Sequence, residues 1–370
     1  MSSPGSDASF ESQPPGDARD GGEGAEGPLR AWIRGLPKAE LHVHLEGSVP
    51  PALALELAAR HGIELPGAEG GVAGLRAAYR FRSFRDFIGL YVAISSCLVD
   101  AADFELLVWG VGRELQTQGV HYAEMTFTPM THVARGVDAA AMLDGLQRGR
   151  VAVESDLGVR IAFVFDIVRS FPDQGGPTVD LMCRARAGGL PVVAIGVGGP
   201  EGPQWPHQPL VPYFQRAKAE GFRSVPHAGE QDGATSVEVA LDAFMADRIG
   251  HGVRSIESPA LIERLVRDGI PLEVCPTSNL RLGIYETMEA HPFERLRAAG
   301  VRVSLASDDP PLFGTTLVDE YQSVAEHFGY GRRDLHALAS AAVEHSFLPE
   351  DEKRALMRAQ ASFVASQGLD

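Results

Sequence analysis

Cysteine is scarce in this chain of 370 residues, which contains only Cys97, Cys183 and Cys275. Their spacing includes no CxxC pair and offers no disulfide framework. A disulfide-stabilised secreted scaffold is therefore excluded, and we expect a protein of the reducing cytoplasm.

Long apolar runs are also missing, because none approaches the roughly 18 residues of a membrane-spanning helix. The start, Met-Ser-Ser-Pro-Gly, lacks the basic and apolar regions of a secretory signal. Positive charge is in deficit, since 49 Asp and Glu outnumber 33 Lys and Arg and give a net charge of −16. Such a surface repels phosphate backbones and anionic lipids, so we expect a small-molecule substrate and neither nucleic acid nor membrane as partner.

Large apolar side chains are rare in residues 1–28, which are rich in Gly, Ser, Pro, Asp and Glu. Such a segment buries too little surface to offset the entropy of ordering it, so a disordered tail is predicted. The chain is 44% hydrophobic, and this favours one large folded unit over residues 29–370.

Short apolar runs alternate with longer helical patterns through this unit. The predicted strands are 40–45, 120–127, 161–168, 191–197, 223–227, 247–251, 271–275 and 301–306. The predicted helices include 51–60, 103–118, 138–156, 234–245, 259–268 and 317–328. Apolar strands separated by helices indicate a parallel sheet covered on both faces, and eight of them favour a closed (β/α)8 TIM barrel over an open sheet.

Two further segments lie between the first two strands. The glycine-rich stretch 67–74 is predicted to be a loop, and 76–99 to form extra helices that cap the C-terminal face of the barrel. A helical stripe runs through the second segment and comprises Phe81, Phe84, Ile88 and Tyr91, and plain helix packing explains it equally well.

Polar side chains gather where the predicted strands end. His42 and His44 close the first strand, His227 the fifth and His251 the sixth, and Asp308–Asp309 follow the eighth. In a (β/α)8 barrel these positions meet at one face, where active sites are built.

These residue types suit a catalytic metal. His42 and His44 are two apart in a strand, so both imidazoles can point to one ion. His227 would complete a three-histidine set, and Asp308 would add a carboxylate oxygen. Each motif alone has a structural explanation: a strand-end histidine with satisfied hydrogen bonds for His251, or a turn for Asp308–Asp309.

The motifs ELHVHLEGS, HAGE, RIGHG, EVCPTSN, VSLASDDP and SFLPEDEKRAL together resemble the adenosine deaminase family. They occur in the family's order and span about residues 38–357, nearly the whole predicted folded unit. The resemblance implies a single Zn²⁺ per chain and hydrolytic deamination at C6 of an adenine-containing compound.

The resemblance also implies roles for individual residues. His42, His44, His227 and Asp308 would be the zinc ligands. Glu230 would protonate purine N1, and His251 would act as base or electrostatic partner for the attacking water. Asp309 would form a hydrogen bond with N7, and the backbone N–H of Gly199 would meet N3.

Two departures from the family pattern touch the sugar side of the pocket. Glu46 stands where adenosine-specific members carry Asp, and residues 195–201 read IGVGGPE in place of a sequence like IDLAGDE. Three substrates therefore compete: adenosine or deoxyadenosine, free adenine, and a 5′-enlarged nucleoside such as 6-amino-6-deoxyfutalosine of the alternative menaquinone route. The smaller, glycine-rich loop makes room and favours the third.

Other classes fit the sequence less well. A cytidine-type deaminase needs a PCxxC motif, which is absent, and a dinucleotide loop would need glycine at position 201, where Glu201 stands. A binuclear amidohydrolase often uses a lysine near strand four, and Lys218 lies beyond it in the following helix. A non-catalytic barrel that binds a ligand is the remaining alternative.

Overall fold

The computed structural model describes residues 27–81 and 83–368 of the chain. The predicted disordered tail lies outside the described residues, except for Gly27 and Pro28. The first helix, α1 (Pro28–Gly35), begins at the last residue assigned to that tail. Among the described residues, no helix is long and apolar enough to cross a membrane.

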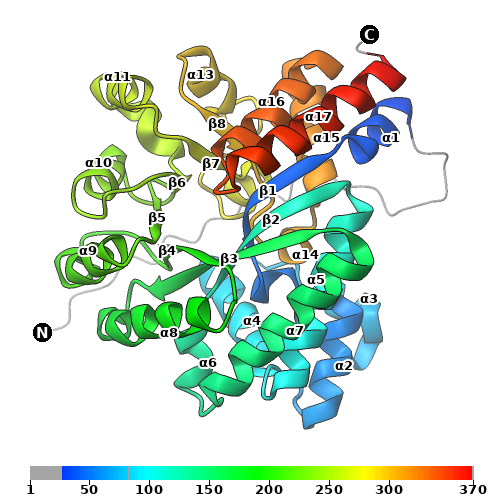
Figure 1. The fold of residues 1–370 in the computed structure, drawn as a ribbon, viewed down its shortest axis with the longest axis vertical. Helices are drawn as coiled ribbons and strands as arrows, with labels where there is room; N and C mark the ends of the chain where they lie inside the picture. Colours follow the sequence, from blue (N-terminus) through cyan, green and yellow to red (C-terminus); the bar gives the residue numbers. More distant parts are fainter. Residues whose placement is uncertain (1–26, 82, 369–370) are drawn as a thin grey trace, which may run out of the picture.

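Eight parallel strands form one sheet in which each strand pairs with the next one along the chain (Figure 1). The strands are β1 (Lys38–His44), β2 (Val120–Phe127), β3 (Arg160–Val168), β4 (Val192–Gly198), β5 (Arg223–Ala228), β6 (Ile249–His251), β7 (Leu272–Val274) and β8 (Val303–Leu305). All eight predicted strands are confirmed, with ends shifted by at most two residues. Val43 lies in β1 and Asp308 follows β8. A parallel bridge between these two residues joins the last strand to the first and closes the (β/α)8 barrel.

Helices surround the ring of strands (Figure 1). They are α2 (Pro51–His61), α3 (Gly71–Ala78), α4 (Phe84–Ser96), α5 (Ala101–Thr117), α6 (Pro129–Val133), α7 (Ala139–Leu157), α8 (Gly175–Ala187), α9 (Val211–Ala219), α10 (Ala234–Asp242), α11 (Pro259–Asp268), α12 (Pro276–Arg281), α13 (Phe293–Ala298), α14 (Pro310–Phe313), α15 (Leu317–Phe328), α16 (Arg332–His345) and α17 (Glu350–Gln367). Short 3₁₀ turns are η1 (Glu46–Ser48), η2 (Ala68–Gly70), η3 (Pro172–Gln174), η4 (Gln208–Leu210) and η5 (Val253–Glu257). The six predicted helices are present, and Lys218 lies in α9 as expected.

The segment between β1 and β2 differs in detail from the prediction. The glycine-rich stretch 67–74 is not a simple loop, because it forms η2 and the first turn of α3. Residues 76–99 divide into the end of α3 and the whole of α4, which Ser83 caps by accepting a hydrogen bond from the Asp86 N–H at 3.2 Å. The buried side chains of α4, Phe87, Leu90 and Ile94, recur every three to four residues and attach the helix to the core.

A buried ion cluster lies inside the barrel. The Arg248 guanidinium donates from Nε to Glu273 Oε1 at 2.5 Å and also pairs with Glu124. The same group donates to the His345 carbonyl and stacks 3.8 Å from the centre of the Phe347 ring. All three charged side chains are at most 1% exposed, so their charges must offset one another.

We predict that Arg248→Ala lowers the free energy of unfolding by about 3–5 kcal/mol, because it leaves two buried carboxylates without a cation. Urea denaturation of the metal-loaded protein measures this difference. Arg267→Ala, which removes an exposed arginine paired with Asp268, is the matched control and should leave the midpoint unchanged. Equal midpoints for both variants would contradict the account.

Candidate metal and catalytic site

The closure of the barrel brings the ends of β1 and β8 together. The His44 N–H donates to the Asp308 carbonyl at 2.8 Å, and the Asp308 N–H donates to the His42 carbonyl at 2.9 Å. Both imidazoles then face the Asp308 carboxylate, with Nε2–Oδ1 distances of 3.5 Å for His42 and 3.3 Å for His44.

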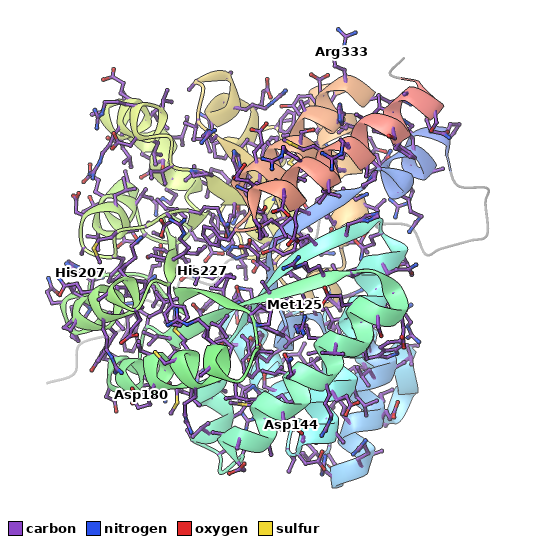
Figure 2. All side chains as sticks on the ribbon, viewed as in Figure 1. Met125, Asp144, Asp180, His207, His227 and Arg333 are labelled. Atoms are coloured by element: carbon purple, nitrogen blue, oxygen red, sulfur yellow. The ribbon has the colours of Figure 1, made fainter. Side chains whose placement is uncertain are left out.

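His227 completes the cluster from β5. Figure 2 shows it at β5, away from peripheral residues such as Asp144 and Arg333. Its Nε2 atom lies 3.1 Å from Nε2 of His44. One ligand atom from each of four side chains lies within 4.8 Å of all the others, namely from His42, His44, His227 and Asp308. The structure thus brings together the four residues that the sequence analysis singled out as metal ligands.

These residues fit a divalent metal. His42, His227 and Asp308 are buried and the His44 side chain is 12% exposed, and His42 Nε2 has no hydrogen-bond partner although it points at the Asp308 carboxylate. Imidazole nitrogens facing each other at contact distance need a proton or a cation between them, and three imidazoles with a carboxylate are a typical zinc donor set. The backbone supports this interpretation, because Asp308 adopts φ of +65°, an uncommon conformation that persists where surrounding contacts enforce it.

Two further side chains orient these ligands, and the sequence prediction missed both. Glu273 Oε2 lies 2.8 Å from His42 Nδ1, so the opposite nitrogen faces the cluster. The Ser278 hydroxyl donates to Asp308 Oδ2 at 2.6 Å. Both residues belong to the EVCPTSN motif, which begins within β7 and gave a family signal but no individual roles.

Glu230 lies beyond β5 at the edge of the cluster. Glu201 fixes this loop, because its Oε2 accepts from the backbone N–H groups of Glu230, Gln231 and Asp232 at 2.8–3.2 Å. Burial, followed by the charges of Asp308 and Glu201, raises the pKa of Glu230 well above its usual value. The carboxyl group is therefore suited to hold and donate a proton at neutral pH.

His251 faces both Glu230 and Asp308. Its Nε2 atom lies 3.7 Å from Glu230 Oε1 and 3.8 Å from Asp308 Oδ2. Asn279 holds the other ring nitrogen at 3.2 Å, and burial lowers the pKa of His251 to about 3. The residue is strained like Asp308, with φ of +60°. The imidazole is thus neutral at pH 7 and able to exchange a proton.

Asp309 follows immediately on the metal candidate Asp308. Gly47 makes room for it, because a Cβ atom there would lie 1.5 Å from Asp309 Oδ1. That oxygen is buried without a hydrogen-bond partner. Burial and the neighbouring Asp308 charge raise the pKa of Asp309 well above its usual value. It can therefore exchange hydrogen bonds with a polar ring edge.

Glu46 begins η1 and is 1% exposed. Its Oε1 atom accepts from the Thr128 N–H at 3.0 Å and lies 3.1 Å from His132 Nε2. Its Oε2 atom has no partner. One oxygen is therefore fixed by β2 and α6, and the other is available to a ligand.

The helix α4 covers this part of the site. Burial raises the pKa of Tyr91 well above its usual value, and the charges of Glu46, Asp309 and Asp166 raise it further. The phenol therefore lies among the acidic groups of the site. The aromatic stripe predicted in this segment thus serves both packing and coverage.

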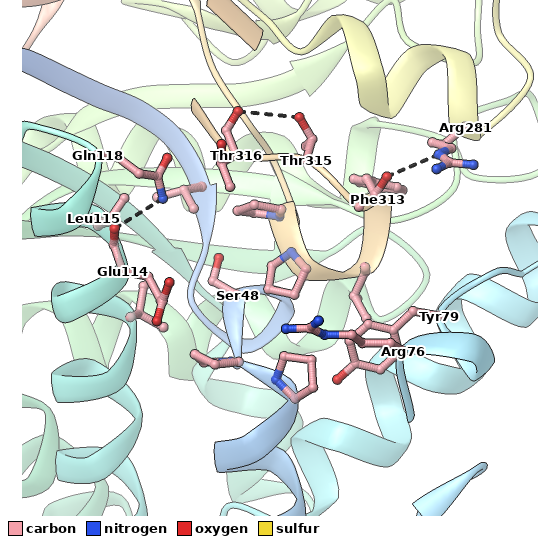
Figure 3. Close-up of a pocket in the computed structure, with 18 of the residues that line it drawn as sticks. Ser48, Arg76, Tyr79, Glu114, Leu115, Gln118, Arg281, Phe313, Thr315 and Thr316 are labelled. Carbon is pink, nitrogen blue, oxygen red and sulfur yellow. Dashed lines mark hydrogen bonds between the residues drawn. The ribbon is translucent and has the colours of Figure 1, made fainter. Parts of the chain in front are cut away.

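A cavity of about 410 Å³ adjoins the site (Figure 3). Its wall includes Ser48, Tyr79 and Phe313, together with the arginines 76 and 281. Val43 and Pro310 also line it, whereas the metal candidates do not. It is a neighbour of the metal cluster and a separate space.

Comparisons with known proteins give matches among deaminases and amidohydrolases. Residues 37–361 match the family model described as adenosine deaminase. The aminodeoxyfutalosine deaminase of Streptomyces avermitilis is 41% identical over 326 residues, covering 86% of this chain and 89% of the relative. The adenine deaminase of Caulobacter vibrioides is 35% identical over 335 residues, which cover 90% of this chain and 96% of the relative. A solved amidohydrolase from Burkholderia ambifaria with bound Zn superposes with a TM-score of 0.83 at 25% identity, covering 94% and 97%.

We predict that Glu273→Gln weakens zinc affinity about 10–100-fold, because an amide accepts the imidazole proton less well than a carboxylate. Titration of the metal-free protein with zinc against a chelator measures this constant. Glu263→Gln, a substitution on the exposed face of α11, is the control and should bind zinc like the unchanged protein. Unchanged affinity in Glu273→Gln would show that this contact does not orient His42.

Proposed function

This chain belongs to the adenosine deaminase family and is a hydrolase of carbon–nitrogen bonds, and we propose that it uses one zinc ion to replace the C6 amino group of an adenine-containing nucleoside by oxygen. The observation that carries the proposal is the convergence of His42, His44, His227 and Asp308 beside Glu230 and His251. The products would be the 6-oxopurine and ammonia.

The four clustered residues would hold the ion. A zinc ion bound by three protein imidazoles lowers the pKa of water from 15.7 to about 7, so a nucleophile is available at neutral pH. The fit of the donor set supports zinc, and the relative from Burkholderia ambifaria was solved with that metal. The lack of a lysine near the end of β4 supports one ion per chain over a binuclear site.

Glu230 would supply the proton that the ring needs. Attack at C6 places negative charge on the purine, and a proton on N1 removes it. The raised pKa keeps the Glu230 carboxyl protonated until that moment. Its loop is rigid because Glu201 holds three successive N–H groups.

His251 and Asp309 would complete the recognition of the reacting ring. His251 would orient the attacking water beside C6 as an electrostatic partner, because Nδ1 accepts from the Asn279 amide and the neutral ring then carries its proton on Nε2. Asp309 would form a hydrogen bond with N7, and the backbone N–H of Gly199 would donate a hydrogen bond to N3. Gly199 lies directly after β4 with φ of +87°, a conformation that favours glycine.

Glu46 supports a nucleoside as the substrate. Its free Oε2 atom is a buried acceptor that can take a hydrogen bond from a sugar hydroxyl. The 41% identity to an aminodeoxyfutalosine deaminase and the small residues of β4 support 6-amino-6-deoxyfutalosine as the first candidate. That choice would place the enzyme in menaquinone biosynthesis, in the reducing cytoplasm that the unpaired cysteines favour.

Free adenine is the second candidate. The same Oε2 atom of Glu46 could accept from N9–H, and several relatives named adenine deaminase are 35–37% identical.

We predict that Glu230→Gln keeps about one zinc ion per chain but lowers kcat by ~10²-fold or more, because general acid catalysis typically contributes 10²–10⁴-fold. Metal analysis and ammonia release under saturating substrate measure the two quantities. Glu263→Gln again serves as the control. Near-normal turnover in Glu230→Gln would remove this residue from the mechanism.

A substrate panel tests the choice of purine. Purified zinc-loaded protein should release ammonia from 6-amino-6-deoxyfutalosine with a higher kcat/KM than from adenosine, deoxyadenosine or adenine. Turnover of adenine alone would reverse the ranking. A lack of ammonia from all four compounds would favour the non-catalytic barrel or a different amidohydrolase reaction.

A further inference from the structure

Two buried polar atoms near the metal cluster have no partner. His227 Nδ1 lies on the side of the ring opposite Nε2, which faces His44. Asp166 Oδ1, from β3, is the other orphan, and this side chain is 3% exposed. An imidazole that binds a metal through Nε2 carries its proton on Nδ1, so the first atom becomes a buried donor. The second is a buried acceptor.

The glycines of β4 leave open the space between these residues. Asp166 pairs with Gly196 across the sheet, and a Cβ atom on Gly196 would lie 2.3 Å from Asp166 Oδ1. A Cβ atom on Gly198 would lie 2.5 Å from Asp166 Oδ2 and 3.9 Å from His227 Cε1. Asp166 and His227 thus both border the space that a side chain on Gly198 would enter.

Arg169, which directly follows β3, contacts the backbone of His227 in β5. Its guanidinium donates to the His227 carbonyl at 2.7 Å and lies 3.7 Å from Glu201. Burial raises the pKa of Asp166 to about 8, and the charges of His42 and Arg169 limit that rise. The backbone of His227 is therefore anchored, whereas its ring has no anchor comparable to the Glu273 contact of His42.

We propose that Asp166 is a positioning residue that accepts a hydrogen bond from Nδ1 of His227 and holds the ring with Nε2 toward the zinc ion. The inference rests on the proposed function only in requiring that the four clustered residues bind zinc. In this proposal the glycines of β4 make room for Asp166 beside the metal site. The sequence had suggested instead that they lie on the sugar side of the pocket. Asp166 would act through His227 and would not contact the purine.

The first test is zinc affinity, measured by chelator competition with metal-free protein and zinc alone. Asp166→Ala should weaken zinc binding about 10–100-fold, the usual effect of losing an outer-sphere partner. Asp166→Asn retains an acceptor oxygen and should lose less. In the zinc-saturated enzyme, kcat should fall with little change in KM.

The second test moves the carboxylate to the neighbouring strand. Gly196→Asp in the Asp166→Ala background should restore much of the zinc affinity, because a side chain on Gly196 starts beside the place that the Asp166 carboxylate leaves. Gly196→Asp alone should destabilise the protein, since two side chains then compete for one space. Asp103→Asn alters a buried carboxylate in the cap of α5, and this control should change stability but not zinc affinity.

Several outcomes would overturn the proposal. Unchanged zinc affinity in folded Asp166→Ala would do so, and so would a rise in KM alone, which would make Asp166 a substrate contact. Failure of Gly196→Asp to recover affinity would also count against it. If Asp166→Ala does not fold, wild-type-like zinc affinity and kcat in Asp166→Gln, which displaces the acceptor, would contradict the inference. Failure of the proposed function would instead appear as absent turnover in the unchanged, zinc-loaded protein.

Discussion

The site depends on how the barrel closes between its first and last strands. Asp308 exchanges backbone hydrogen bonds with both His42 and His44, and the same bridge sets the distance between their side chains. The contact joins parts of the chain that are more than 260 residues apart in sequence. Because two ligands and their carboxylate share one backbone bridge, an error in register here would separate all three. The remaining architecture holds this short bridge in place.

Electrostatics explains why so many acids can be buried together. Glu46, Asp166, Glu230, Asp308 and Asp309 are all at most 7% exposed and lie around the imidazoles. Burial favours the protonated form of most of them, as the raised pKa values of Glu230 and Asp309 show. Asp308 differs, because the surrounding histidines hold its pKa well below the usual value despite burial. One carboxylate is thus ionised for a cation, and its neighbours keep protons that chemistry on a purine can use.

The sequence predicted the parts that depend on local patterns. Strands and helices followed from apolar runs and periodicity, and the metal candidates followed from histidines and aspartates at strand ends, strengthened by the family motifs. Asp166, Arg248 and Glu273 were not predicted, because each lies within an apolar strand or at its start and its partners come from distant strands. The left-handed backbone of His251 and Asp308 also left no signal in the sequence. The glycine-rich stretch 67–74 was predicted to be a loop, whereas it forms η2 and the first turn of α3.

The central claim is that three imidazoles and one carboxylate share a single zinc ion. X-ray absorption spectroscopy of the zinc-loaded protein at the zinc edge tests it most directly. The account predicts a shell of nitrogen and oxygen atoms at about 2.0–2.2 Å that includes imidazole scattering. A sulfur shell at about 2.3 Å would contradict it by pointing to Cys275, which groups with His251 and Asp308. A second metal at about 3.5–4 Å would contradict it by showing a binuclear site.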